Sequence, residues 1–157
     1  MKRHRSLHPL SEHHHHVLVQ ALLIRRAGEK PPPQRAAALR RAARELLRFW
    51  KKTGRKHFRE EEEVLLPAYA RHVSLADDPA VVRMLADHAA IRAAFGELEQ
   101  ALRARRPVET VVTRLAQRLH DHVRLEEEKV FPRMEAALSE EELRALALTR
   151  LHRVSAR

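Results

Sequence analysis

The sequence predicts an all-α protein with four long helices and a short fifth one. Ala, Leu, Arg and Glu dominate the chain, and these residues are strong helix formers. Gly is rare, and runs of β-branched residues are missing. Apolar side chains recur at helical spacing between a few Pro and Gly boundaries, as they do on the buried faces of packed helices. These three observations favour helices over strands throughout the chain.

The first two expected helices occupy about residues 9–28 and 34–72. The first helix has a proline in its opening turn, and Gly28 suits its C-terminal cap. Three consecutive prolines then form a stiff connection. Within the second helix, Gly54 is a weak point. Pro67 is expected to kink or fray that helix, because proline lacks the backbone N–H that an interior position needs.

The third and fourth expected helices occupy about residues 79–106 and 108–138, and a short fifth helix follows at about 140–150. Asp78 is expected to be the N-cap of the third helix, with a proline after it in the first helical turn. Ser139 has a glutamate three residues later, which is the pattern of a capping box at the start of the fifth helix.

An eleven-residue segment occurs twice in the chain. The first copy, HFREEEEVLLP, begins at His57; the second, HVRLEEEKVFP, begins at His122; they are identical at six of eleven positions. Each copy places a His four residues before a Glu, Glu61 in the first copy and Glu126 in the second. Four residues make about 400° on an α-helix, so the two side chains lie about 40° apart and one turn along. This spacing suits a pair of metal ligands, offered twice.

Helical projection places both His–Glu pairs on apolar stripes. On the second expected helix the pair shares its side with apolar residues such as Leu46, and on the fourth helix with residues such as Val112 and Leu119. The pairs therefore interrupt a core-facing surface. The stripe on the fourth helix falters beyond Glu126, where we expect Pro132 to shift the helical phase.

Two further histidines are expected to face the same core. His88 lies on the apolar side of the third helix, and apolar residues follow it at three, seven and ten positions along. His14 repeats that pattern on the first helix, whereas His13 gives a poorer apolar face. From the run of four adjacent histidines we therefore choose His14, with His13 as the alternative.

The result is an expected metal site of four His and two Glu drawn from four helices. Buried ionised carboxylates are costly unless they are paired or bind a metal. Imidazole and carboxylate groups are ligands of non-haem iron, and carboxylates can bridge two ions, although zinc and manganese also accept such ligands. The expected ligands are His14, His57, Glu61, His88, His122 and Glu126.

The order of these residues resembles the hemerythrin-like HHE cation-binding domain. The resemblance rests on a lone His, HFREE, a lone His in DHAAIR, and HVRLEE with VFP after it, and it covers about Leu7 to Leu138. It implies an up-down-up-down four-helix bundle around two non-haem irons, bridged by carboxylates and by an oxo or hydroxo group. It further implies that the four His are terminal ligands and that the two Glu are bridging ligands.

One departure separates the chain from the oxygen-carrying hemerythrins of invertebrates. Those proteins have a fifth His one turn from the third-helix His, where this chain has Met84 and Arg92. The departure argues against a pure oxygen-transport role. We expect Arg92 to hold an anion or a Glu carboxylate beside the site.

The resulting functional expectation is a protein that binds or senses O₂, NO, peroxide or iron, rather than an enzyme. A ferritin-like di-iron oxidase or peroxidase is one alternative; the ExxH pattern of that class occurs here at Glu12–His15, within the run of histidines. A metal-free helical interaction module is another. The expected partners are a small diatomic ligand or peroxide and a separate signalling protein.

Composition excludes several other classes of protein function. The chain has no Cys, which excludes disulfides and thiolate ligands. Its net charge of +10 comes from scattered basic residues without aromatic interleaving, so we do not expect nucleic-acid binding. No stretch reaches the roughly 18 apolar residues of a membrane span, and the N-terminus lacks the apolar segment of a signal peptide. We therefore expect one cytoplasmic domain over residues 1–157, with a loose tail after about His152.

Overall fold

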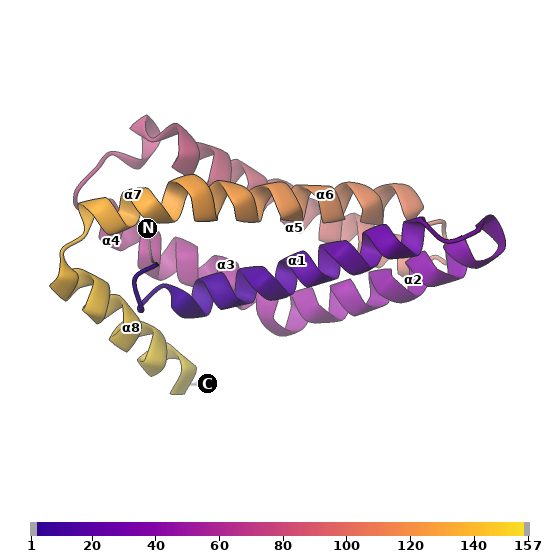
Figure 1. Ribbon diagram of the computed structural model, residues 1–157, viewed down its shortest axis with the longest axis horizontal. Helices are drawn as coiled ribbons and strands as arrows, with labels where there is room; N and C mark the ends of the chain where they lie inside the picture. The colour runs from indigo at the N-terminus through magenta and orange to yellow at the C-terminus, as the bar shows by residue number, and fades with distance from the viewer. Residues whose placement is uncertain (1–2, 156–157) are drawn as a thin grey trace.

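The computed structural model describes residues 3–155, with side chains described through Ala147. Every regular element in this part of the chain is helical, as the sequence predicts (Figure 1). The α-helices are α1 (His8–Gly28), α2 (Pro32–Phe49), α3 (Arg55–Glu60), α4 (Leu66–Tyr69), α5 (Pro79–Arg103), α6 (Glu109–Leu125), α7 (Phe131–Ala137) and α8 (Glu140–Ser155). A 3₁₀ turn spans Leu75–Asp77, and π-helical turns span Trp50–Gly54, Glu61–Leu65 and Glu126–Val130.

Two of the π-helical turns, Glu61–Leu65 and Glu126–Val130, keep long helical runs continuous across a proline. The N–H of Leu66 donates to the carbonyl oxygen of Glu61, and the N–H of Phe131 donates to that of Glu126. The next residue in each run is a proline, which has no N–H to donate and whose ring clashes with the carbonyl four residues earlier in a regular α-helix. The wider turn relieves this conflict. Its extra residue rotates the rest of the helix by about 100°, which is the phase shift predicted at Pro132.

Consecutive long helices run side by side in opposite directions (Figure 1). The turn between α1 and α2 lies at one end of the molecule, and the N-terminal residues and α8 lie toward the other (Figure 1). Helix α1 packs against α2 and α6, and α5 packs against the same two helices. Side chains from all four of these helices therefore meet along a common interior.

A layer of polar residues divides the apolar interior into two clusters. The cluster toward the α1–α2 turn includes Ile24, Trp50, Leu98 and Leu115. The cluster at the opposite end includes Leu10, Leu65, Met84 and Phe131. On α1 the first cluster begins at Val17 and the second ends at Leu10, and the interval between them contains His14. The other long helices carry a similar interval, so buried polar side chains gather between the two apolar clusters.

Two predicted helix starts have the expected caps. The carboxylate of Asp78 accepts a hydrogen bond from the backbone N–H of Ala80, which makes it the N-cap of α5. Ser139 and Glu142 exchange both bonds of the capping box before α8. At the end of α1 the chain continues through Glu29 in a right-handed conformation, so α1 does not end in the left-handed glycine cap that Gly28 suggested.

Other boundaries differ by a few residues from those expected. Helix α2 starts two residues early at Pro32, and the continuous run after it ends three residues early at Tyr69. Helix α8 extends to Ser155, because the chain has no Gly or Pro after the capping box to end it. The side chain of His152 and the last two residues of the expected loose tail lie outside the described part of the chain.

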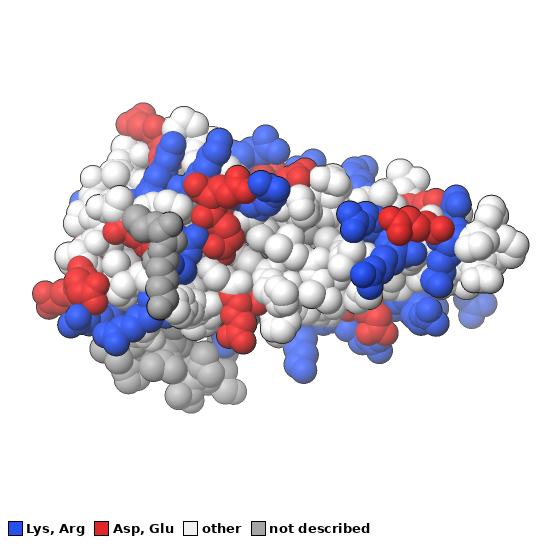
Figure 2. All heavy atoms as spheres, in the orientation of Figure 1, with Lys and Arg blue, Asp and Glu red and all other residues white. Residues whose placement is uncertain are grey.

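Charged side chains on the face seen in Figure 2 form separate groups. Basic and acidic residues lie side by side in several of these groups, other basic residues stand alone, and uncharged surface lies between them (Figure 2). The positive net charge is thus not gathered into one continuous basic surface on this face. Among the helices described, none has the length and apolar character that crossing a membrane requires.

Candidate metal centre

All six predicted ligands lie in the polar layer between the apolar clusters. His14 comes from α1, His57 from α3, His88 from α5 and His122 from α6. Each glutamate is the first residue of a π-helical turn. Every one of the six residues is at most 5 % exposed. The sequence-derived set is therefore brought together from four parts of the chain, with its polar atoms removed from solvent.

Glu61 lies between two pairs of histidines. Its Oε1 is 3.0 Å from Nε2 of His57 and 3.7 Å from Nε2 of His14. Its Oε2 is 3.4 Å from Nε2 of His88. The two oxygens of one carboxylate thus face different imidazoles.

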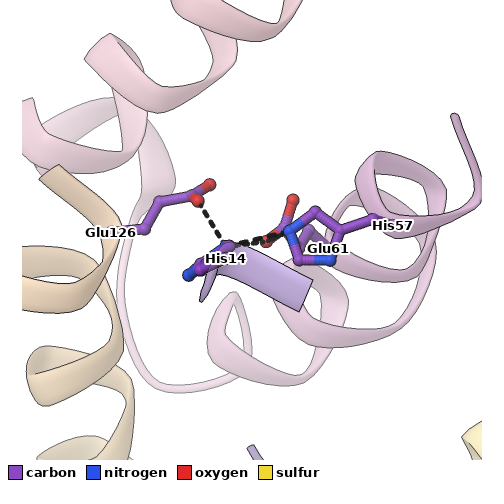
Figure 3. A group of neighbouring side chains, drawn as sticks. All are labelled: His14, His57, Glu61 and Glu126. Atoms are coloured by element: carbon purple, nitrogen blue, oxygen red, sulfur yellow. Dashed lines mark hydrogen bonds and ion pairs between the residues drawn. The ribbon is translucent and has the colours of Figure 1, made fainter. Parts of the chain in front are cut away.

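Glu126 divides its oxygens in the same way. Its Oε2 is 3.0 Å from Nε2 of His14 (Figure 3). Its Oε1 is 3.1 Å from Nε2 of His122 and 3.5 Å from Nε2 of His88. Both carboxylates therefore span the same two histidine pairs, one formed by His14 with His57 and the other by His88 with His122.

The spacing between these atoms fits ligands of a common ion. The Nε2 atoms of His14 and His57 lie 2.9 Å apart (Figure 3). Two ligands about 2.1 Å from one ion and at right angles to each other are separated by roughly 3.0 Å. The shortest nitrogen–oxygen separations in the cluster, 3.0 to 3.1 Å, match that value. One ligand atom from each of His14, His57, Glu61 and Glu126 lies within 4.8 Å of the others, and the same holds for His88, His122 and Glu126.

Most of these converging atoms have no hydrogen-bond partner. Among the described residues, both oxygens of Glu61 and of Glu126 are fully buried without a hydrogen bond, as is Nε2 of His88 and of His122. Buried polar atoms in folded proteins are nearly always hydrogen-bonded, and unpaired buried carboxylates are costly. A cation between the imidazoles and the carboxylates satisfies all of these atoms at once, so the donor set fits a metal.

The pKa values of the cluster also indicate that its two carboxylates favour positive charge nearby. Burial lowers the pKa of His88, but the neighbouring carboxylates of Glu126 and Glu61 outweigh burial and raise it to about 10. Burial and the charge of Glu61 raise the pKa of Glu126, yet the imidazoles of His122 and His14 outweigh them and hold that pKa below its usual range. The two carboxylates therefore favour a positive charge on the neighbouring imidazole of His88, and a metal ion at this place would supply such a charge.

The model of the hemerythrin HHE cation-binding domain matches residues 6–153 of the chain. The chain belongs to this family. No curated protein and no solved structure gives a significant match. The family assignment agrees with the resemblance seen in the sequence, and cation binding is the property that the family and the buried cluster share.

Two glutamates of the HHE domain that sequence analysis did not single out also contact the cluster. Glu127 Oε1 lies 2.7 Å from Nδ1 of His14, and Glu62 Oε1 lies 2.7 Å from Nδ1 of His88. Burial raises the pKa of Glu127, but its bonds with His14 and Arg3 outweigh burial and help to lower that pKa to about 2. The glutamate runs look like solvated faces in the sequence. The signal that could have identified these two is the EE doublet, which both copies of the repeat share.

Met84 and Arg92, the residues one turn from His88 where the oxygen carriers have a fifth His, lie in different surroundings. Met84 is fully buried in the apolar cluster around α4 and α7. Arg92 donates from Nη2 to Oε2 of Glu62 at 2.8 Å. It therefore holds a glutamate carboxylate beside the HHE centre, as the sequence predicts.

The other histidines whose side chains the structure describes do not join the cluster. His13 stacks on His57, and its Nε2 is hydrogen-bonded to Oγ1 of Thr53 at 3.2 Å. His15 is exposed, as is Glu12, so the single ExxH pattern lies on the surface. The structure thus places His14 in the cluster and leaves the alternative, His13, beside it.

A small apolar cavity of about 20 Å³ adjoins the cluster. Its walls come from α1, α2, α3, α5, α6 and the turn around Gly54, and three of the clustered histidines border it. The lining residues are His13, His14, Val17, Leu46, Phe49, Trp50, Gly54, His57, Phe58, Phe95, Leu119, His122 and Val123. A cavity needs roughly 10–15 Å³ to hold one water molecule, so this one has room for a ligand of about that size.

Proposed function

We propose that this HHE domain is a non-haem di-iron protein that binds or senses a small ligand such as O₂ or NO. The proposed iron ligands are His14, His57, Glu61, His88, His122 and Glu126. The observation that carries the proposal is the division of each carboxylate between two histidine pairs. A carboxylate whose oxygens face different imidazole pairs is placed to bridge two ions.

The count of donors supports open coordination at both ions. Each histidine pair, together with one oxygen from each glutamate, offers four protein ligands. Non-haem iron commonly takes more than four ligands, so the protein leaves room for an external molecule. Imidazole and carboxylate ligands favour iron over the softer metals that prefer thiolate. We further propose that the packing of α1, α2, α5 and α6 is the up-down-up-down four-helix bundle of the family.

The cavity beside the cluster supports a small apolar ligand. Its walls are largely aliphatic and aromatic, and an apolar cavity of that size holds water poorly. A neutral diatomic molecule loses little hydration on entering it, whereas peroxide requires hydrogen-bond partners that such walls lack. We therefore favour O₂ or NO over peroxide, and binding or sensing over oxidase or peroxidase chemistry. In this proposal, a separate signalling protein receives the output.

Metal analysis with an absorption spectrum tests this function. We expect about two irons per chain and absorption bands that change on adding O₂, NO or azide. His57→Ala and His122→Ala should each disrupt the centre, because each removes one ligand from a different histidine pair. His120→Ala is a matched control for His122→Ala. His120 lies on α6 with His122, and its side chain is exposed and paired to Asp121. A wild-type protein that takes up no iron under reducing, anaerobic loading contradicts the proposal.

A further inference from the structure

Two carboxylates outside the proposed ligand set stand in equivalent places. Glu62 directly follows Glu61, and Glu127 directly follows Glu126. Each reaches the lone histidine of a neighbouring helix, and both oxygen–nitrogen distances are 2.7 Å. In each copy of the HxxxEE segment, the first Glu of the doublet therefore faces the centre, and the second Glu holds a histidine from another helix.

Each of these carboxylates is itself fixed by an arginine. Oε2 of Glu62 accepts from Arg92 at 2.8 Å, and Oε2 of Glu127 accepts from Arg3 at 2.7 Å. The two glutamates are less than one-third exposed. One oxygen of each carboxylate thus serves an imidazole while the other serves a guanidinium, and the charge of the glutamate is balanced without drawing on the centre.

An aromatic ring completes each unit in the same manner. The ring of Phe58 stacks on His88 with centroids 3.7 Å apart, and Phe131 stacks on His14 at 5.3 Å. Each phenylalanine also lies beneath the arginine of its unit, 5.3 Å from the guanidinium carbon in both cases. Each lone histidine is therefore held through Nδ1 by a carboxylate and across its face by an aromatic ring.

The histidines of the HxxxE pairs are held differently. Each lies one helical turn from its own glutamate, at 3.0 Å for His57 and 3.1 Å for His122. Nδ1 of His122 is buried and has no hydrogen-bond partner among the described residues. Each of these two histidines thus has a carboxylate from its own helical run beside it, whereas the carboxylate that bonds each lone histidine comes from another helix.

We infer that Glu62 and Glu127 are positioning residues, each of which sets the tautomer and orientation of one lone histidine and so the affinity of one of the two metal sites. An Nδ1–H bonded to a carboxylate leaves the lone pair on Nε2, the atom that faces the centre. Glu127 acts on the site that contains His14, and Glu62 acts on the site that contains His88. This inference rests on the proposed di-iron function.

Competition with an iron chelator tests it on the full chain. Glu62→Ala and Glu127→Ala should each lower the affinity of one of the two iron sites by about 10- to 100-fold, the usual effect of losing such a partner. The double variant should lower the affinity of both sites. The Gln variants at the same positions keep an oxygen that accepts the Nδ1–H bond. They should therefore recover part of the affinity, while the absorption spectrum shifts because the charge is gone.

The repeat supplies matched controls at the next position. Glu63 and Glu128 pair with Arg59 and Arg124 of their own helices on the surface. Glu63→Ala and Glu128→Ala should keep both irons at the wild-type affinity. Wild-type affinity in Glu62→Ala and Glu127→Ala overturns the inference, and so does an equal loss in the controls. A wild-type protein that binds no iron instead overturns the proposed function, so the two failures can be told apart.

Discussion

The imidazole of His13 stacks on the imidazole of His57, with ring centroids 4.2 Å apart and the planes inclined by 23°. Burial, together with the nearby imidazoles of His57 and His14, lowers the pKa of His13 to about 3. His13 is therefore neutral at physiological pH and adds no positive charge beside the proposed iron site. It acts as part of the cavity wall and as a support for the ring of His57.

The two adjacent histidines of α1 should differ sharply in iron binding. His13→Ala should retain about two irons per chain, since His13 is outside the cluster, whereas His14→Ala should lose at least one. Iron per chain, measured after identical reconstitution, checks this. The opposite pattern, with iron lost from His13→Ala and kept by His14→Ala, would exchange the roles of the two residues.

Removing iron should lower the stability of the protein. Without a metal, both oxygens of Glu61 and of Glu126 and the Nε2 atoms of His88 and His122 remain in the interior without a hydrogen bond. A ligand present at 100 times its dissociation constant stabilises a protein by about 2.7 kcal/mol, which corresponds to roughly 5–10 °C in melting temperature for a chain of this size. Scanning calorimetry with and without iron measures the difference. In the His57→Ala, His122→Ala double variant, the melting temperature should no longer respond to iron.

Helical periodicity predicted most of the site because its ligands interrupt apolar stripes. The HxxxE spacing places His57 and Glu61 on one face without any knowledge of the neighbouring helices. Glu62 could not be found this way, because its function depends on a histidine 26 positions later in the chain. The π-helical form of the turns before Pro67 and Pro132 was not predicted either, although a phase shift at Pro132 was, because periodicity does not record how a proline and the carbonyl before it avoid a clash.

Gly54 is expected to tolerate no side chain. A Cβ atom at this position would lie 2.4 Å from Cε3 of Trp50, whose rigid ring is stacked on Phe95 and cannot move away freely. Gly54→Ala should therefore destabilise the fold by about 1–3 kcal/mol, the usual cost of overpacking. Gly96 provides the control, because a Cβ there meets no atom within 4 Å. Gly96→Ala should stabilise α5 by about 0.5–1 kcal/mol, as Ala does for Gly in a helix. Urea unfolding measures both, and the same sign for the two variants contradicts the argument.

Asp78 should make stability depend on acid pH. Burial raises the pKa of Asp78, but bonds from the Ala80 N–H and the Tyr69 hydroxyl and the charge of Arg133 outweigh it and lower that pKa. A carboxyl whose pKa is lower in the folded state contributes stability at neutral pH, and loses that contribution as the pH falls through its folded pKa.

The variant Asp78→Asn keeps a residue suited to an N-cap but removes the charge. We expect it to be about 1–2 kcal/mol less stable than wild type at pH 7, the scale of hydrogen bonds to charged groups. The difference should shrink below the ordinary carboxyl pKa of 3.8, where the wild-type carboxyl also loses its charge. Asp77→Asn, at an exposed neighbour, is the control and should show no such convergence. A pH-independent difference between Asp78→Asn and wild type would rule out the charge as its cause.

Replacing Arg105 with glycine should make the protein more stable. It is the non-glycine residue with positive φ, 54°, in the described chain. The N–H of Arg106 donates to the Ala101 carbonyl, and that of Arg105 to the Leu102 carbonyl, which together form the cap in which glycine usually takes the left-handed position. Arg40 donates to the backbone carbonyls of Arg105 and Arg106, so truncating the side chain of Arg105 leaves these bonds in place.

A left-handed conformation costs a residue with a Cβ about 1–2 kcal/mol, and glycine avoids this cost. Glycine also makes the unfolded chain more flexible, which offsets part of the gain. Arg105→Gly should therefore raise the free energy of unfolding by about 0.5–1 kcal/mol. Arg106→Gly offers the matched control: its backbone is not left-handed, so the added freedom of the unfolded chain should lower its stability. Denaturant midpoints at one pH and salt concentration compare the three proteins. If Arg105→Gly is less stable than wild type, the Arg105 side chain contributes more than its backbone strain costs.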